Sequence, residues 1–249
     1  YSNLTLSYPS SRVDKTREMY IKKKKWFTGV NNLTIVTPSQ WLANRVKESF
    51  LSQYPIKVIN NGINLNIFKP TSNDFRVKYN LANKILLLGV ANSWSQRKGL
   101  NIFIELSKRL ENNYKIVLVG LTKKQIKGLP SNIIGIQRTE SKKELAEIYS
   151  SADFFINPSL EETMGLVTLE SLACGTPVIV SNSTAVPEVV TDECGIVVTN
   201  YNVESFFYAI INNKKEFKKE DCIKQAKNYE MNKKYEDYLN LYDSILIKN

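Results

Sequence analysis

The chain has 249 residues, of which 43% are hydrophobic and 23% are charged, and its formal net charge at pH 7 is +10. This composition is typical of a globular chain with one large or two ordinary domains. The longest apolar run, at residues 85–91, has the length of a strand, and no run approaches the roughly 20 residues that a membrane-spanning helix needs.

The sequence contains no histidine and three cysteines, Cys174, Cys194 and Cys222. Their spacing is unlike that of a metal-binding motif, so the sequence disfavours a structural zinc site, and it offers no catalytic histidine. An odd number of cysteines without a pairing pattern indicates a reducing compartment, and we expect a cytoplasmic location.

Residues 1–26 carry half of the excess positive charge. The seven basic residues of this patch are Arg12, Lys15, Arg17, Lys22, Lys23, Lys24 and Lys25, against two acidic residues, Asp14 and Glu18. One interpretation is attraction to anionic lipid headgroups at the inner face of a membrane, or to a phosphorylated substrate. The other is a solvated basic face. No nucleic-acid-binding motif is recognised, and we expect no nucleic-acid partner.

The first part of the chain shows one strand–helix–strand pattern. Residues 33–37 predict a strand, Ser39 caps a helix over residues 40–52, and residues 57–59 predict a second strand. The sequence Asn60-Asn61-Gly62 is a turn signal, and the stretch from Gly62 to Pro70 has the composition of a linker.

From residue 84 onwards, apolar strands alternate with amphipathic helices. Strands are predicted at residues 84–91, 115–119, 132–136, 153–157, 177–180 and 195–198. Helices are predicted at residues 99–111, 141–151, 165–174 and 203–213, with a short helical turn at residues 186–190. This alternation predicts an α/β fold with a doubly wound, Rossmann-like parallel sheet, which binds ligands beyond the carboxyl ends of its strands.

The tail from residue 216 is charged and helical, and its apolar residues fall at helical spacing. These residues are Tyr235, Tyr238, Leu239, Tyr242, Ile245 and Leu246. We expect this stripe to cover the region before the linker, and the alternative is packing on its own domain.

Two glutamates separated by seven residues, Glu162 and Glu170, flank a turn at Met164-Gly165 and the start of a predicted helix. An acid before the helix, unpaired N–H groups at its first turn and a second acid farther along can hold a nucleotide sugar at three points. Taken alone, the same pattern also fits a capping residue and a solvated helix residue.

The order of motifs resembles the donor site of retaining glycosyltransferases of family 4, also called glycosyl transferases group 1, which have the GT-B fold. The motifs are Thr37-Pro38-Ser39, Asn61-Gly62-Ile63, Arg97-Lys98-Gly99-Leu100, Val117-Leu118-Val119-Gly120, Asn157-Pro158-Ser159, Glu162 with Glu170, Ala173-Cys174-Gly175-Thr176-Pro177 and Val186-Pro187-Glu188-Val189-Val190. The resemblance covers roughly residues 31–213 and is specific as an ordered set.

Members of this family normally have two Rossmann-like domains. The resemblance therefore implies that residues 1–66 are a remnant of the N-terminal, acceptor-binding domain with the hinge. Residues 67–215 would form the donor-binding domain, and residues 216–249 would return toward the N-terminal domain. We expect the chain to be a fragment of a longer protein.

The resemblance also implies roles for single residues. Glu162 would accept hydrogen bonds from the hydroxyls of the donor sugar, and Lys98 would neutralise the donor diphosphate as its charge grows. The family's other base has no clear counterpart, and Arg97 would substitute for it. The alternative for Arg97 and Lys98 is a capped helix start with solvated bases.

The remaining implied contacts concern the nucleotide. The backbone N–H groups of Thr163, Met164, Gly165 and Leu166 would bind the diphosphate, and Glu170 would bind the ribose hydroxyls. The base would lie near Gln137 and Arg138, where backbone groups contact it.

The function implied is retaining transfer of a sugar from a nucleotide diphosphate sugar, by default a UDP-sugar, to a glycan or lipid-linked acceptor. Bacterial polysaccharide, lipopolysaccharide or capsule biosynthesis is the expected setting, with peripheral membrane contact through the basic patch. We expect no cofactor and no metal, because no Asp-x-Asp motif occurs. One alternative is a nucleotide-sugar-binding module without turnover. The other is a GT-B-fold epimerase, which the absence of histidine disfavours.

Overall fold

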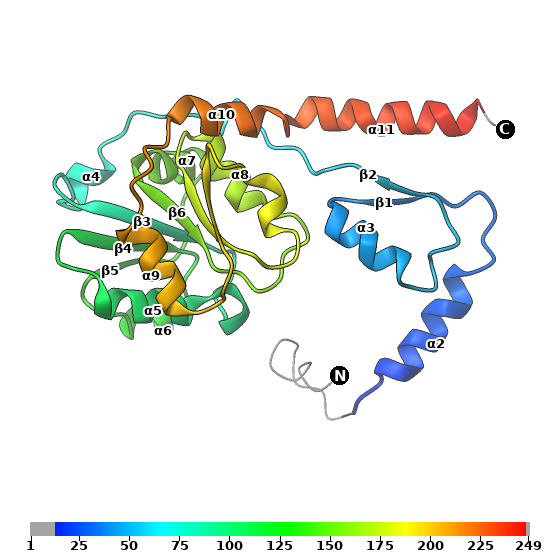
Figure 1. The fold of residues 1–249 in the computed structure, drawn as a ribbon, viewed down its shortest axis with the longest axis horizontal. Coiled ribbons are helices and arrows are strands. Elements are labelled where there is room, and N and C mark those ends of the chain that lie inside the picture. Colours follow the sequence, from blue (N-terminus) through cyan, green and yellow to red (C-terminus); the bar gives the residue numbers. More distant parts are fainter. Residues whose placement is uncertain (1–12, 248–249) are drawn as a thin grey trace. The chain divides into compact units, whose positions relative to one another are not determined.

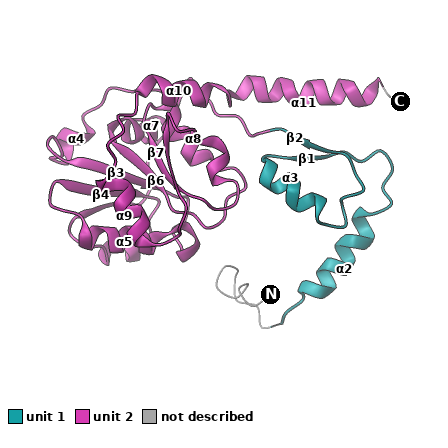
Figure 2. Cartoon of the chain, viewed as in Figure 1, with its two compact units in different colours: residues 1–59 teal, residues 60–249 magenta. Residues whose placement is uncertain are grey.

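The computed structural model describes residues 13–247 and divides the chain into two compact units, residues 1–59 and residues 60–249 (Figure 2). Arg12, which belongs to the basic patch, lies outside the described residues.

The first unit contains a strand–helix–strand motif. Its elements are α2 (Thr16–Phe27), β1 (Ile35–Thr37), α3 (Gln40–Lys47) and β2 (Ile56–Val58). The two strands are parallel, with Ile35 opposite Ile56. The connection between them passes through α3, which is the crossover that two parallel neighbours need.

Helix α3 begins as predicted and ends early. The hydroxyl of Ser39 accepts the N–H of Leu42, the bond expected of a cap. The predicted end at residue 52 is wrong, because the helix stops at Lys47. The Ser49 hydroxyl donates to the carbonyl of Val46, and turns follow to residue 54. A serine that bonds to the backbone in this way competes with continuation of the helix.

The second unit is built on a six-stranded parallel sheet with the order β5-β4-β3-β6-β7-β8 (Figure 1). Its strands are β3 (Ile85–Val90), β4 (Tyr114–Val119), β5 (Ile133–Ile136), β6 (Phe154–Asn157), β7 (Val178–Ser181) and β8 (Gly195–Val198). All six were predicted from the sequence, and the predicted doubly wound α/β fold is confirmed.

Helices cover both faces of this sheet. Along β3, Leu86 and Leu88 belong to one buried cluster and Leu87 belongs to the other, as the alternation of side chains in a strand requires. Helices α7, α8 and α10 contribute to the first cluster, and α5 and α9 contribute to the second. The bounds of these helices are α5 (Leu100–Arg109), α7 (Lys142–Ser151), α8 (Leu166–Ala173), α9 (Val203–Ile211) and α10 (Lys219–Lys227).

Short elements complete the unit: α4 (Phe75–Lys78), η1 (Gln96–Lys98), α6 (Lys123–Lys127) and η2 (Val186–Val189). Of these, only η2 had been predicted. Helix α6 starts with a reciprocal cap, in which Thr122 accepts the N–H of Gln125 and the Gln125 side chain accepts the N–H of Thr122. This pattern is visible in the sequence and could have revealed the helix.

The tail forms two helices, α10 and α11 (Met231–Leu246). They are separated where the chain pairs with Ile63, which donates its N–H to the carbonyl of Tyr229 and accepts the N–H of Met231. On α11, Leu241 is buried, whereas most of the predicted stripe is exposed. The return of this helix toward the first unit stays a prediction.

The three cysteines are free thiols, and all of them are buried. Burial raises the pKa of Cys174 and that of Cys222 to about 12.

Among residues 13–247, no helix combines the length and the apolar character needed to cross a bilayer.

Gly120 follows β4 with φ of +98°, and a Cβ atom at this position would lie 1.6 Å from the carbonyl oxygen of Ala91. We therefore expect Gly120→Ala to lower the free energy of unfolding by at least about 2 kcal/mol, from backbone strain and steric overlap together. Urea unfolding measures this change. The matched control is Gly128→Ala, because Gly128 has ordinary φ and its nearest contact is at 3.6 Å. Equal stability of the two variants would contradict the packing described here.

Candidate functional site

The site predicted from the sequence lies at the point of the sheet where the strand order reverses. Strands β3 and β6 are neighbours, but the chain continues from β3 to β4 and β5 on one side and from β6 to β7 and β8 on the other. The loops after β3 and β6 therefore leave the carboxyl edge of the sheet in opposite directions. A crevice opens at such a point in doubly wound sheets and is their usual ligand-binding position.

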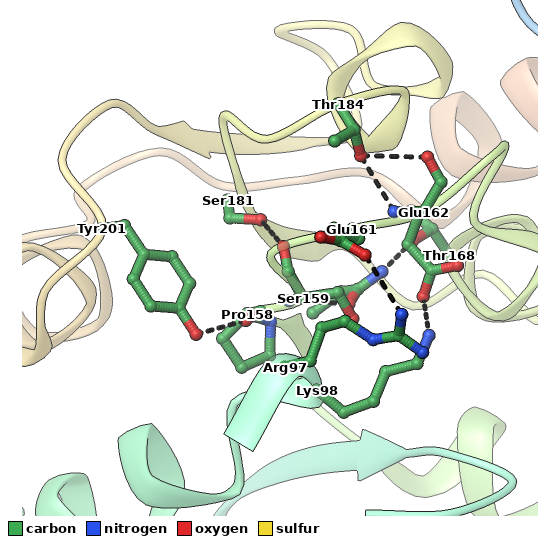
Figure 3. A network of polar contacts seen from close by, with 11 residues as sticks. Arg97, Lys98, Pro158, Ser159, Glu161, Glu162, Thr168, Ser181, Thr184 and Tyr201 are labelled. Carbon is green, nitrogen blue, oxygen red and sulfur yellow. Dashed lines mark hydrogen bonds and ion pairs between the residues drawn. The ribbon is translucent and has the colours of Figure 1, made fainter. Parts of the chain in front are cut away.

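Two ion pairs join these two loops (Figure 3). The ammonium group of Lys98 pairs with the carboxylate of Glu162, and Arg97 Nη1 lies 3.0 Å from Glu161 Oε2. The Lys98 and Glu162 side chains are only 26% and 17% exposed, whereas the Arg97 and Glu161 side chains are 36% and 49% exposed. The structure thus brings together the three residues predicted to be catalytic, and it adds Glu161, which the sequence analysis did not select.

The backbone between these loops is also in close contact. Leu160 donates its N–H to the carbonyl of Arg97 at 2.9 Å. Gly99 has φ of +76°, and a Cβ atom there would lie 2.6 Å from both the carbonyl oxygen and the side chain of Pro158. Glycine at position 99 therefore permits the approach that places Lys98 beside Glu162.

Buried polar side chains fix the loop after β6. Asn157 donates from Nδ2 to the hydroxyl of Thr168 at 3.1 Å, and its Oδ1 accepts the N–H of Ser159 at 3.2 Å. The carbonyl of Ser159 accepts the hydroxyl of Ser181 on β7 at 2.5 Å. The start of this loop is therefore tied to both the following helix and the neighbouring strand.

Two further residues hold the loop from the side of β7 and β8. The hydroxyl of Thr184 accepts the N–H of Glu162 and donates to its carbonyl, both at 2.9 Å. Thr184 itself has φ of +52°. Tyr201 donates its hydroxyl to the carbonyl of Pro158 at 2.9 Å. Neither Thr184 nor Tyr201 was predicted, because no local pattern in the sequence marks a contact over such a separation.

The N-terminus of α8 directly follows the loop that carries Glu162 and has no capping side chain. Gly165 precedes the helix with φ of +78°, and no side chain caps it. Within residues 13–247, no acceptor is paired with the backbone N–H groups of Thr163, Met164, Gly165 or Leu166. Unpaired N–H groups at the start of a helix carry partial positive charge and favour a phosphate or carboxylate.

Glu170 lies one turn farther along α8 and is largely withdrawn from solvent. Its Oε2 accepts the hydroxyl of Tyr149 at 3.0 Å. Burial raises the pKa of Glu170 to about 7, although the Tyr149 hydrogen bond and the charge of Lys142 oppose this shift. The alternative interpretation of Glu170 as a solvated helix residue is therefore wrong.

Gln137 and Arg138 follow β5 and are exposed. The preceding carbonyl, of Ile136, accepts the N–H groups of Gly120 and Leu121. These residues lie on the same carboxyl edge of the sheet as the two central loops, but β4 separates β5 from β3. The contact between residues 137–138 and a nucleotide base stays a prediction.

Two other features bear on the chemistry of the molecule. In the described part of the chain, no group of three or more Cys, Asp or Glu side chains is placed to hold a metal ion. A cavity of about 570 Å³ lies at the amino ends of β6 and β7, lined in part by Phe154, Pro177 and Lys219. It is at the opposite edge of the sheet from Lys98 and Glu162, and we treat it as separate from the site.

The pattern of the family described as "Glycosyl transferases group 1" matches residues 82–213. Because this is more than half of the chain, the chain belongs to that family, and the resemblance found in the sequence is confirmed.

Curated relatives agree with this assignment. The chain is 30% identical over 157 residues to a processive diacylglycerol alpha-glucosyltransferase of Acholeplasma laidlawii, which covers 58% of this chain and 47% of the relative. It is 26% identical over 235 residues to an O-antigen chain mannosyltransferase of Salmonella typhimurium, covering 89% of this chain and 61% of the relative. The chain thus spans between about half and three fifths of these two proteins.

Solved structures share the fold. A sucrose-phosphate synthase from Thermosynechococcus elongatus matches with a TM-score of 0.82 and 19% identity, covering 98% of this chain and 65% of the other. An Anabaena protein in complex with UDP-glucose matches with a TM-score of 0.76 and 17% identity, covering 92% and 68%. At these identities the likeness shows the fold alone, which is that of GT-B glycosyltransferases, as predicted.

The raised pKa of Glu170 makes stability depend on pH. Between the unfolded value of 4.5 and the folded value of about 7, the folded state binds more protons than the unfolded state, so stability falls as pH rises through this window. We expect Glu170→Gln to raise the free energy of unfolding by about 3 kcal/mol at pH 8 and to change it little at pH 4.5. Urea unfolding at both pH values measures the difference. A constant difference between wild type and variant across this range would contradict the burial of an ionisable carboxyl.

Proposed function

We propose that this chain carries the donor site of a retaining glycosyltransferase that transfers a sugar from a nucleotide diphosphate sugar to a glycan or lipid-linked acceptor. The observation that carries the proposal is the pairing of Lys98 with Glu162 across the loops after β3 and β6. A positively charged group for the diphosphate and a carboxylate for the sugar hydroxyls therefore lie next to each other, at the edge of the sheet where ligands usually bind.

The positive charges would act on the leaving group. When the bond between the sugar C1 and the diphosphate oxygen breaks, negative charge grows on the diphosphate. Lys98 has three N–H donors and can contact a phosphate while it keeps Glu162 as a partner. Arg97 and the N–H groups at the start of α8 add to this field. Each such contact lowers the activation free energy of transfer by roughly 3 kcal/mol.

The two carboxylates would bind the two ends of the donor. Glu162 accepts hydrogen bonds from sugar hydroxyls, and Glu170 accepts them from the ribose. Support for a nucleotide sugar comes from the structural neighbour in complex with UDP-glucose and from curated relatives named GDP-mannose-dependent mannosyltransferases. UDP is our default nucleotide. The positive charge comes from side chains and amides, so the proposed transfer needs no metal.

The test is the effect of Lys98→Ala and Glu162→Ala on donor use. We expect each variant to lower the affinity for UDP-glucose or GDP-mannose, or the rate of transfer, at least about tenfold, because each removes one charged contact to the donor. Titration calorimetry measures donor binding, and product analysis in the presence of EDTA measures transfer and the anomeric configuration of the product.

The matched control is Lys108→Ala, which removes an exposed lysine of α5 that pairs with Glu105. Its donor affinity should equal that of the wild type. Unchanged binding and transfer in both site variants would refute the site assignment. Donor binding without transfer to any acceptor would favour the binding module, and release of an epimerised sugar would favour the epimerase.

We further propose that helix α2 contacts anionic lipid. None of its residues is buried, and the run Lys22–Lys25 is followed by Trp26 and Phe27, which are 60% and 50% exposed. Basic residues near a membrane surface contribute about 1 kcal/mol each when the lipid is anionic, and exposed aromatic side chains suit the headgroup region.

Flotation with vesicles of phosphatidylglycerol and phosphatidylcholine tests this contact. We expect the chain to float with these vesicles at low salt, to float less at high salt, and to lose binding when residues 22–25 are changed to glutamine. The control variant carries the same charge change at exposed positions elsewhere: Lys123, Lys124, Lys127 and Lys143. Equal flotation of both variants would show that net charge, and not α2, determines binding.

A further inference from the structure

A buried phenol lies behind the carboxylate that would bind the ribose. Tyr149, on α7, is fully buried, and its hydroxyl donates to Glu170 Oε2 at 3.0 Å. The two side chains come from helices that pack side by side on one face of the sheet. A phenylalanine would fill the same volume, so packing alone does not account for the hydroxyl, whose burial requires a partner.

The surroundings of Tyr149 hold its ring in one position. The ring makes edge-on contacts with Phe68 and Phe155, with centroids 6.3 Å and 5.6 Å away. The backbone is held too, because the hydroxyl of Thr176 donates to the carbonyl of Tyr149 at 2.6 Å. The phenol is therefore a fixed donor, and it determines where Oε2 of the facing carboxylate lies.

The other oxygen of Glu170 remains open to a ligand. Within residues 13–247, Oε1 has no hydrogen-bond partner, yet no buried side-chain oxygen is left unsatisfied there. Oε1 is consequently reached by solvent. One oxygen is held by the protein and the other can accept a hydrogen bond from outside, which is the arrangement of a carboxylate held in position for an incoming hydroxyl.

We propose that Tyr149 is a positioning residue, which through its hydrogen bond fixes Glu170 so that the free oxygen accepts the ribose hydroxyls of the donor nucleotide. This inference rests on the proposed function, because it needs a nucleotide at the site. It adds to that function a residue that does not touch the ligand and that determines how well the ribose is recognised.

Several titratable groups act on this carboxylate. Burial raises the pKa of Glu170 to about 7, and the Tyr149 hydroxyl and the Lys142 ammonium, both on α7, lower it. Cys174, the residue at the C-terminal cap of α8, also lies near the pair. For the described residues of β6, β7, η2 and α10, which also contact α8, no charge acting on Glu170 is resolved.

The direction in which removal of the Tyr149 hydroxyl changes the pKa of Glu170 can therefore be predicted. Without this donor the pKa of Glu170 rises further, and less of the carboxylate is ionised at neutral pH. If the ionised form accepts the ribose hydroxyls, affinity falls and its pH midpoint moves upward. The chain has no histidine, so no ordinary imidazole titration obscures this range.

The experiment compares two ligands that differ only in the ribose hydroxyls, UDP and 2′,3′-dideoxy-UDP, by titration calorimetry from pH 6 to pH 8.5. For Tyr149→Phe we expect about tenfold weaker binding of UDP at pH 7, unchanged binding of the dideoxy analogue, and a pH midpoint above that of the wild type. Glu170→Gln should weaken UDP binding similarly and remove the difference in pH dependence between UDP and the dideoxy analogue, which share the titration of the terminal phosphate.

The control is Tyr229→Phe, which removes another partly buried phenol whose hydroxyl lies 3.5 Å from the carbonyl of Glu188. It should leave both affinities unchanged. If Tyr149→Phe does not fold, 3-fluorotyrosine at position 149 keeps the packing and makes the phenol a stronger donor. It should lower the pH midpoint for UDP.

The outcomes separate the two proposals. If Glu170→Gln weakens UDP binding and Tyr149→Phe does not, the positioning role is overturned and the donor site stands. If Tyr149→Phe weakens both ligands equally, the phenol only supports the packing of α7 on α8, and the inference is again overturned. If the wild type binds none of UDP, GDP and ADP, the proposed function fails and this inference fails with it.

Discussion

The pairing of β3 with β6, in which Leu87 lies opposite Phe154, is the constraint on which the site depends. It makes two loops that are about sixty residues apart in sequence leave the same edge of the sheet next to each other. Only this neighbourhood allows Lys98 to reach Glu162, and only a glycine at position 99 lets the second loop lie against the first. Sheet order, loop contact and ion pair form one causal chain, and the chemistry proposed for this family member depends on all three.

Much of this fold can be read from the sequence because its strands are buried on both faces. Such strands are short, nearly continuous apolar runs, and all six were found within a few residues of their observed bounds. Less was predictable where a few hydrogen bonds determine where a helix ends. The end of α3 depends on the hydroxyl of Ser49, and the division of the tail depends on pairing with Ile63, a partner more than 160 residues away.

The site shows the same division between local and distant causes. The ordered motifs selected Lys98, Arg97, Glu162 and Glu170, and the structure places the first three together. The residues that hold them were missed. Thr184 clamps the backbone of Glu162 and Tyr149 holds Glu170, over separations of 22 and 21 residues. A threonine in a loop and a tyrosine on a helix carry no local sign of such a contact, and only the tertiary fold reveals it.

The burial of all three thiols has a practical consequence for work on this molecule. Thiolate is the form that reacts with maleimides, and a buried thiol whose pKa is raised to about 12, as for Cys174 and Cys222, offers almost none at neutral pH. A cysteine introduced on the surface would therefore be the preferred target for a fluorophore or spin label. One label in residues 13–59 and another in residues 60–247 would then report the distance between the two units in solution, with the native thiols left in place.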